Sequence, residues 1–304
     1  MQRRNCQPVE QESLNAFWYW VNERHLIYLK KLAGEPWPWT ADKVLQEYRF
    51  CNVFRELDIV TIQFRELIRE RYADHPNLWF AYCLARQINW PDTVSEIMQQ
   101  TSFPDYWVPE SVYDVLRQRQ ARGDKLYTGA YMLRGDIQRE GEDNNKPRYT
   151  VFRVLDPIWQ SGCRGPITPF CMNSDPRAGG SIQAATEWLE GHSGWGGFLA
   201  YEVATDLRHT RYLENAPDIM TWANPGPGAK RGLNRIFGRP LNKALGRDQA
   251  IDEMRWLLAE SPTYLATHVP ALEMRDIEHS LCETDKMLRV KHGEGRPRAK
   301  YHHA

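Results

Sequence analysis

The sequence lacks several features that would assign it to a common class of protein. Six cysteines are spread along it, at Cys6, Cys51, Cys83, Cys163, Cys171 and Cys282. They form no C-x-x-C pair, which argues against a zinc site and favours reduced thiols. There is no G-x-x-x-x-G-K-S/T phosphate loop, so a P-loop kinase is not expected. The sequence also shows no internal repeat, no signal-peptide pattern and no apolar run long enough to span a membrane, and we expect a cytoplasmic protein.

The chain also lacks a net charge. Its 304 residues include 39 basic and 39 acidic ones. Any attraction to nucleic acid must therefore come from local basic patches and not from the whole surface. With 42% hydrophobic residues, the chain can bury a core as one large or two modest domains, and we expect a soluble globular protein.

Apolar residues recur at helical spacing on both sides of a stretch rich in proline and glycine. Helices are predicted from Ser13 to Gly34 and at 48–71, 78–88, 93–99, 110–120, 181–190 and 272–288. Between them, 134–181 is predicted to be an irregular linker, with one or two short strands near 149–155. The predicted fold is all-α and two-lobed, with lobes at 12–133 and 182–290 and a basic tail at 291–304.

A glycine turn followed by basic residues stands out at 224–248, NPGPGAKRGLNRIFGRPLNKALGRD. Glycines flanking Pro227 force a tight turn at the start of a helix, where exposed amides and the helix dipole can bind a phosphate. Such a turn can equally do no more than join two helices. The cations that follow suit a nucleic-acid backbone. We predict DNA contacts at Gly226, Gly228, Lys230, Arg231, Arg235 and Arg239.

Residues 218–222 read as the end of a preceding helix, which gives 216–238 the plan of a helix-hairpin-helix. This segment resembles the helix-hairpin-helix DNA glycosylase superfamily, whose glycine turn is often followed by a functional lysine and, farther on, an aspartate. Lys230 and Asp248 fall where such residues would be looked for. Asp248 can equally cap the helix that follows it.

Two segments combine charges of both signs with an apolar face. The first holds Asn52, Arg55, Glu56 and Asp58, and the second holds Arg275, Asp276, Glu278, Glu283, Asp285 and Lys286. These charges form either solvated surface networks or the walls of a polar cleft. A third pair of acids, Glu202 and Asp206, flanks a buried stripe near 198–207.

Several separated blocks resemble the phage thymine-hypermodification family. They are CNVFRELDIVT, GFLAYEVATDL, GPGAKRGLNR, MRDIEHSLCETDK and GEGRPR, and the resemblance runs from about Phe17 to Arg298. That family includes the helical domain associated with 5-hydroxymethyluracil DNA kinases and the α-glutamyl/putrescinyl thymine pyrophosphorylases. The resemblance implies a glycosylase-like helical fold that acts on 5-(pyrophosphoryloxymethyl)deoxyuridine in DNA. It further implies that an amine or amino acid replaces the pyrophosphate, for evasion of host restriction.

This reaction needs a flipped base, cations at the leaving pyrophosphate and a carboxylate base for the amine. We expect catalytic roles for Arg55, Glu56, Asp58, Arg275, Asp276, Glu278 and Lys286. Secondary candidates are Asn52, Glu202, Asp206, Asp248, Glu283 and Asp285. No ligand motif demonstrates a cofactor, although a divalent metal bridging the pyrophosphate is compatible with the chemistry.

The expected partners are duplex DNA carrying modified thymine, an amino acid or polyamine donor and a 5-hydroxymethyluracil DNA kinase. A phage-encoded protein would meet them in the host cytoplasm. Two other functions are open. A DNA glycosylase would use Lys230 or Asp248, and a non-catalytic helper of the kinase would bind DNA without turnover.

Overall fold

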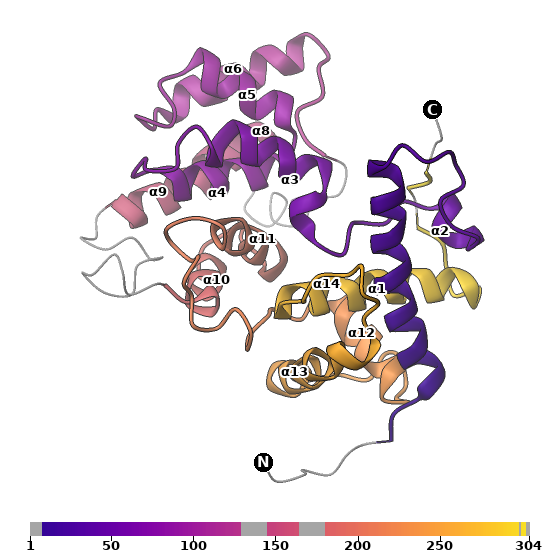
Figure 1. The fold of residues 1–304 in the computed structure, drawn as a ribbon. Coiled ribbons are helices and arrows are strands. Elements are labelled where there is room, and N and C mark those ends of the chain that lie inside the picture. Colours follow the sequence, from indigo (N-terminus) through magenta and orange to yellow (C-terminus); the bar gives the residue numbers. More distant parts are fainter. Residues whose placement is uncertain (1–7, 129–144, 164–179, 298, 302–304) are drawn as a thin grey trace. The chain divides into compact units, whose positions relative to one another are not determined.

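The computed structural model describes residues 8–128, 145–163, 180–297 and 299–301. Within these ranges the chain is built from helices (Figure 1), and the all-α prediction is confirmed. The described residues form no β-strand. Their β-type backbone pairing is limited to an isolated antiparallel bridge between Tyr48 and Lys300. None of their helices is long and apolar enough to cross a membrane. Most of the predicted linker at 134–181 lies outside the described residues.

The chain divides into two compact units. The terminal unit joins both ends of the chain, 1–58 and 219–304, and the central unit is 59–218. The lobes predicted at 12–133 and 182–290 divide the chain at different places. Periodicity along a sequence cannot show that the first helix packs with the last ones, because such pairing depends on contacts far apart in the chain.

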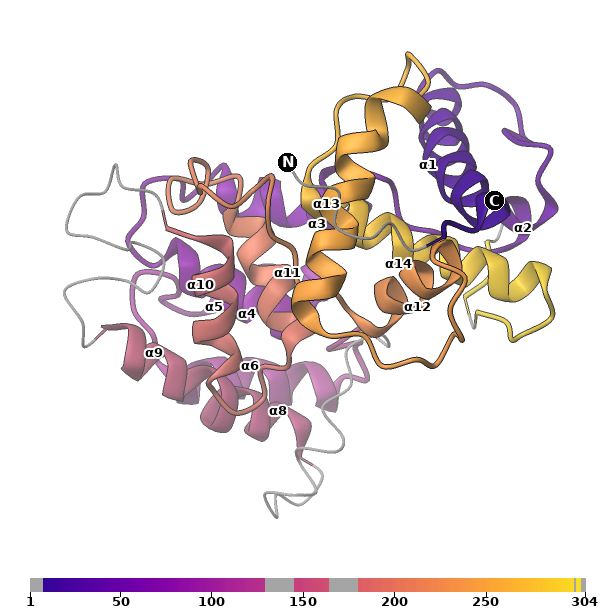
Figure 2. The same ribbon diagram turned by 90° about the horizontal axis from the view of Figure 1, so that it is seen from below.

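The terminal unit is organised around its last helix. It contains α1 (Gln11–Leu32), α2 (Lys43–Glu47), the 3-10 turn η1 (Arg55–Leu57), α12 (Pro227–Ile236), α13 (Arg247–Tyr264) and α14 (Met274–Lys291). α14 packs against α1, α12 and α13 (Figure 2). The predicted cap of α1 was Ser13, but the carboxylate of Glu10 accepts from the amides of Glu12 and Ser13 at 3.2 and 2.6 Å. The first helix therefore begins slightly earlier than predicted.

The central unit surrounds a wholly buried helix. It contains α3 (Ile59–Phe64), the π-helix η2 (Arg65–Arg69), α4 (Leu78–Ile88), α5 (Pro91–Gln100), α6 (Pro109–Ala121), α8 (Lys146–Tyr149), the π-helix η3 (Thr150–Leu155), α9 (Asp156–Cys163), α10 (Ile182–Glu190) and α11 (Gly197–Leu207). Every residue of α4 is buried. Aromatic rings pack on it, with Phe80 lying 4.8 Å from Trp107 and 4.9 Å from Trp159 between ring centroids.

Several local predictions are wrong. Residues 149–155 are helical, because burial of Val151, Val154 and Leu155 against neighbouring helices overrides their preference for strands. Residues 218–222 form turns and not the end of a helix. The carboxylate of Asp218 instead accepts from the amides of Ile182 and Gln183 at 2.9 Å each, at the start of α10. The first helix of the predicted helix-hairpin-helix at 216–238 is thus missing.

Candidate functional site

The charged segments of the terminal unit meet beside Glu283. The carboxylate of this α14 residue accepts from the backbone amide of Cys51 at 3.0 Å and from the ammonium of Lys286 at 2.7 Å. Lys286 also lies 4.6 Å from the centroid of the Phe50 ring. The chain that leads into η1 is therefore held against α14 by a buried carboxylate.

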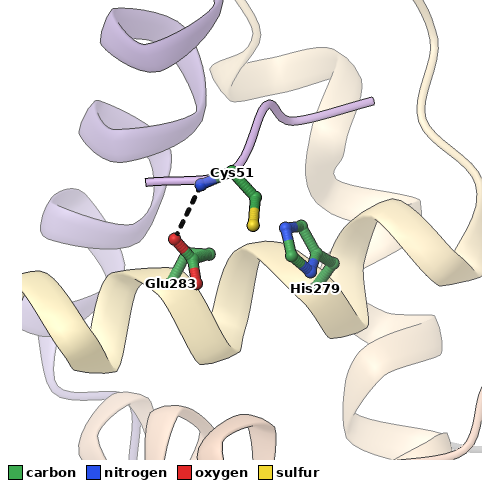
Figure 3. A group of neighbouring side chains, drawn as sticks. All are labelled: Cys51, His279 and Glu283. Carbon is green, nitrogen blue, oxygen red and sulfur yellow. Dashed lines mark hydrogen bonds between the residues drawn. The ribbon is translucent and has the colours of Figure 1, made fainter. Parts of the chain in front are cut away.

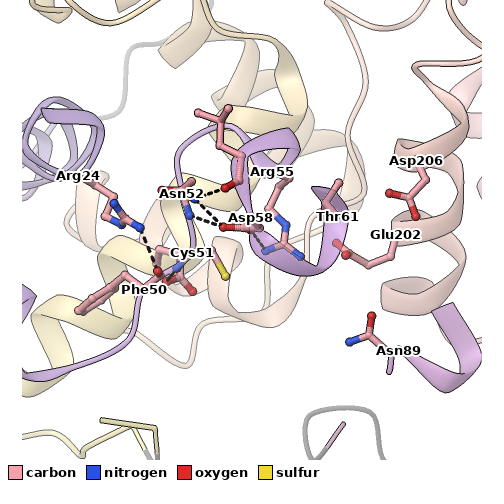
Figure 4. Close-up of polar contacts among 12 residues, drawn as sticks. Arg24, Phe50, Cys51, Asn52, Arg55, Asp58, Thr61, Asn89, Glu202 and Asp206 are labelled. Carbon is pink, nitrogen blue, oxygen red and sulfur yellow. Dashed lines mark hydrogen bonds and ion pairs between the residues drawn. The ribbon is translucent and has the colours of Figure 1, made fainter. Parts of the chain in front are cut away.

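Asp58 organises the turn at η1. Its carboxylate pairs with Arg55 and accepts from the backbone amide of Asn52 at 2.8 Å and from its side-chain amide at 3.0 Å (Figure 4). The same side-chain amide donates to the Leu57 carbonyl at 2.7 Å. These hydrogen bonds close the turn, so Asp58 and Asn52 have a structural role in it. Glu56 lies in the turn and is half-buried.

Burial sets the electrostatics around Cys51. It raises the pKa of the Cys51 thiol to about 12, and the nearby charge of Glu283 adds to this effect. The thiol is therefore protonated at neutral pH and is not a ready nucleophile. Burial also lowers the pKa of Arg24 on α1, against the opposing attraction of Asp58. Arg24 donates to the Phe50 carbonyl at 3.4 Å.

The thiol of Cys51 faces two side chains of α14, as Figure 3 shows. The Sγ of Cys51, a ring nitrogen of His279 and a carboxylate oxygen of Glu283 all lie within 4.8 Å of one another. His279 and Glu283 share a face because residues four apart in a helix are neighbours. The H-x-x-x-E spacing was visible in the sequence, but its partner Cys51 is too distant along the chain to be inferred. Neither Cys51 nor His279 was predicted to act in the site.

The predicted residues at the start of α14 have different environments. Asp276 accepts from the backbone amide of Glu273 at 2.8 Å and completes a capping box, which gives it a structural role. Glu278 accepts from the amide of Gly226 at 3.0 Å. Arg275 is buried, and its Nη2 has no hydrogen-bond partner among the residues that the structure describes. The Nη1 atom of Arg24 is likewise buried and has no hydrogen-bond partner in the described part of the chain.

The glycines of the turn allow α12 to approach α14 closely. A Cβ on Gly228 would lie 2.4 Å from the Sγ of Cys282, and one on Gly232 would lie 2.7 Å from the Leu281 carbonyl oxygen. Larger residues would force the helices apart. Because the Gly226 amide already donates to Glu278, helix packing accounts for much of this motif without a bound phosphate.

The predicted DNA-binding arginines are engaged within the terminal unit. Asp285 accepts from Arg231 at 3.1 Å and from Arg235 at 2.8 Å. Both arginines also pair with Glu294, and Arg239 pairs with Glu253 at 2.5 Å. A phosphate would have to compete with these carboxylates. Lys230 is half-buried, and no pairing with an acid is recorded for it in the described ranges.

Asp248 does not cap the helix that follows the basic segment. The N-cap of α13 is Gly246, and Asp248 is an exposed residue of its first turn. There its negative charge interacts favourably with the positive end of the helix dipole, but its side chain does not cap the helix. The predicted cap is therefore wrong by two positions.

The secondary candidates Glu202 and Asp206 belong to the central unit, where they neutralise Arg86. The Arg86 guanidinium donates to both carboxylate oxygens of Asp206, at 2.5 and 2.6 Å, and lies 3.5 Å from Glu202. Thr61 and Asn89 accept further bonds from it at 3.3 and 3.4 Å. The charge of the buried arginine therefore accounts for the presence of both carboxylates in the core of the central unit.

Comparison with known proteins gives the following matches. Residues 11–296 match the family described as 5-hmdU DNA kinase, helical domain. A curated protein of Bacillus phage SP10 named 5-hmdU DNA kinase is 27% identical over 236 residues, which cover 71% of this chain and 35% of the relative. The chain thus spans about a third of the length of this relative. No solved structure matches.

Proposed function

This chain belongs to the family of 5-hmdU DNA kinase helical domains, and on that premise we propose that it is a transferase that hypermodifies thymine in DNA. Its substrate would be 5-(pyrophosphoryloxymethyl)deoxyuridine, and an amine or amino acid would replace the pyrophosphate. The structural observation that supports this proposal is the presence of buried arginine nitrogens without partners in the described part of the terminal unit, at Arg24 and Arg275. Buried guanidinium groups with spare donors suit a phosphate-rich leaving group.

The reaction exchanges one bond at the methylene carbon on the base. The bond from this carbon to the bridging oxygen breaks, and the pyrophosphate leaves with the electron pair. A bond from carbon to the amine nitrogen forms, and the surplus proton of the amine passes to a carboxylate. Cations must stabilise the negative charge that grows on the leaving group.

The terminal unit offers residues for each of these tasks. We assign leaving-group binding to Arg275 and Arg24, with Arg55 as a further candidate. Proton acceptance is assigned to Glu278, whose carboxylate is oriented by the Gly226 amide. Glu56 is the second candidate for the base. Asp276 and Asp58 have no role in the proposed chemistry, because the helix cap accounts for Asp276 and the hydrogen bonds of the turn account for Asp58.

DNA would be held through the basic segment that includes α12. We propose Lys230 as its first phosphate contact. Arg231, whose side chain is 32% exposed, would contribute by exchanging Asp285 and Glu294 for phosphate. Arg235 is 6% exposed in its side chain and would mainly hold α12 on α14. Hence Lys230→Ala should reduce the salt dependence of duplex binding by about one unit of slope. Arg235→Ala should instead lower stability.

The transfer is tested with duplex DNA that carries 5-(pyrophosphoryloxymethyl)deoxyuridine. The protein is incubated with this duplex and a panel of amino acids and polyamines, and nucleosides from the digested DNA are measured by mass spectrometry. We expect a new nucleoside that contains the amine. Duplex with unmodified thymine is the matched control. Strand cleavage after alkali without an amine adduct would reveal a glycosylase and overturn the proposal.

A second function is favoured by one observation. The relative named 5-hmdU DNA kinase is much longer than the matched segment, which covers 35% of its length. A helical module of this kind could present DNA to a kinase without turnover of its own. Duplex binding and faster phosphorylation of 5-hydroxymethyluracil DNA by an added kinase, with no amine adduct under any condition, would establish this function in place of the transferase.

A further inference from the structure

Cys51, His279 and Glu283 bring three different metal-donor groups together in the terminal unit. A thiol, an imidazole and a carboxylate converge from two parts of the chain, with all three donor atoms within 4.8 Å of one another. In a tetrahedral zinc site, metal-ligand distances of about 2.0 to 2.3 Å place neighbouring donors roughly 3.3 to 3.6 Å apart. Side-chain rotations that shorten the distances between the donor atoms by about an ångström would give that spacing.

The backbone already holds these ligands in place. His279 and Glu283 are fixed by their spacing on α14, while the amide of Cys51 donates to the Oε2 atom of Glu283 at 3.0 Å. Lys286 pairs with the same oxygen at 2.7 Å. The contacts of Oε2 leave the other carboxylate oxygen, Oε1, to serve as a ligand. Hydrogen bonds of this kind commonly orient the carboxylates that bind metals.

We propose that the terminal unit binds a divalent transition metal of the zinc class through Cys51, His279 and Glu283. The thiol and imidazole select zinc and similar metals over magnesium and calcium, which prefer oxygen ligands. Three protein ligands leave one coordination position for water or for an oxygen of a ligand, as in catalytic zinc sites. Metal binding would not depend on the proposed transferase reaction.

The charges balance once the metal is bound. Coordination releases the proton of the Cys51 thiol. The thiolate and the Glu283 carboxylate then carry two negative charges, which match the two positive charges of the metal. Lys286 can stay paired with the second oxygen of Glu283, although its positive charge should weaken binding relative to a site without a neighbouring cation.

The first test measures metal in the wild-type protein. Protein purified without chelators from zinc-supplemented cells should contain about one zinc per chain by mass spectrometry. X-ray absorption at the zinc edge should show a sulfur neighbour at about 2.3 Å, together with lighter neighbours. Protein without bound zinc, or with zinc that has no sulfur neighbour, would overturn the proposal.

The second test uses matched cysteine variants after replacement of zinc by cobalt. The cobalt-thiolate charge-transfer band in the near ultraviolet should be present in the wild type and absent from Cys51→Ser. It should persist in Cys282→Ser, because Cys282 lies on the same helix but its sulfur faces Gly228 on α12. The far-ultraviolet circular dichroism of each variant shows whether it is folded. If Cys51→Ser is unfolded, the absorption measurement on the wild type still decides the question.

The other ligands are tested by affinity. His279→Gln and Glu283→Gln should each bind cobalt at least tenfold more weakly than the wild type, since even outer contacts to metal ligands are worth about 10-fold to 100-fold in affinity. His268→Gln, which changes another half-buried histidine of the same unit, should bind cobalt normally. Unchanged affinity in both ligand variants would overturn the assignment of these residues.

Discussion

Replacing Asp206 by asparagine should strongly destabilise the central unit. The side chains of Arg86 and Asp206 are each 1% exposed, and the two bonds between them are 2.5 and 2.6 Å long. Removal of one partner from a buried ion pair costs about 3 to 5 kcal/mol, because the other charge stays buried without compensation. Glu202 lies 3.5 Å from Arg86 and can neutralise part of that charge. We therefore expect a loss of about 3 kcal/mol, at the lower end of the range.

Urea unfolding provides the assay, with hydrogen exchange of α4 and α11 to locate the effect in the central unit. A loss of about 3 kcal/mol moves the midpoint down by about 1 to 3 M for a slope of about 1 to 3 kcal/mol per molar urea. Asp114→Asn is the matched control. Its pair with Arg117 is 3.8 Å long, with side chains 63% and 64% exposed, so its midpoint should not move.

Equal midpoints for the Asp206 variant and the Asp114 control would refute this reasoning. Such a result would mean that neutralising Asp206 leaves the free energy of unfolding unchanged. The ion pair with the buried Arg86 would then contribute nothing to stability. The structural explanation for this acidic residue would then fail.

Further predictions concern the terminal unit. Gly228→Ala should lower its stability by about 1 to 3 kcal/mol through overpacking, and Cys282→Ala should recover part of that loss, whereas additive effects in the double-mutant cycle would contradict the close packing. Burial lowers the pKa of His25 in the folded state, so the unfolded chain binds the proton more readily. Stability should therefore fall as the pH drops through about 6.5, less so in His25→Gln, as pH-dependent thermal melting would show. Glu278→Gln should abolish amine transfer while Asp248→Asn retains it, and the reverse result in single-turnover assays would favour glycosylase-like chemistry.

Local patterns were sufficient to predict much of the helical fold. Apolar periodicity and helix-breaking residues predict the helices at 78–88, 93–99, 110–120 and 181–190, which the structure contains as α4, α5, α6 and α10. Predictions failed where a distant contact decides the outcome. Asp218 was assigned to a helix, but its carboxylate binds amides at the start of α10.

The site was predictable only in part for the same reason. Charge patterns drew attention to Glu283 and Lys286, which lie in the polar cluster of the terminal unit. Cys51 and His279 were missed, since a single thiol and a single imidazole carry no signal until the fold brings them together. The basic residues of α12 indicated DNA, yet the sequence could not show that Asp285 accepts from Arg231 and Arg235.

The central claim is that an amine replaces pyrophosphate on a modified thymine. Its most direct test is a single turnover with protein in excess over duplex carrying 5-(pyrophosphoryloxymethyl)deoxyuridine and with an isotope-labelled amine donor. We predict that pyrophosphate and the labelled nucleoside appear at the same rate and in equal amounts. Release of pyrophosphate with conversion of the base to 5-hydroxymethyluracil, or release of the free base, would contradict the account.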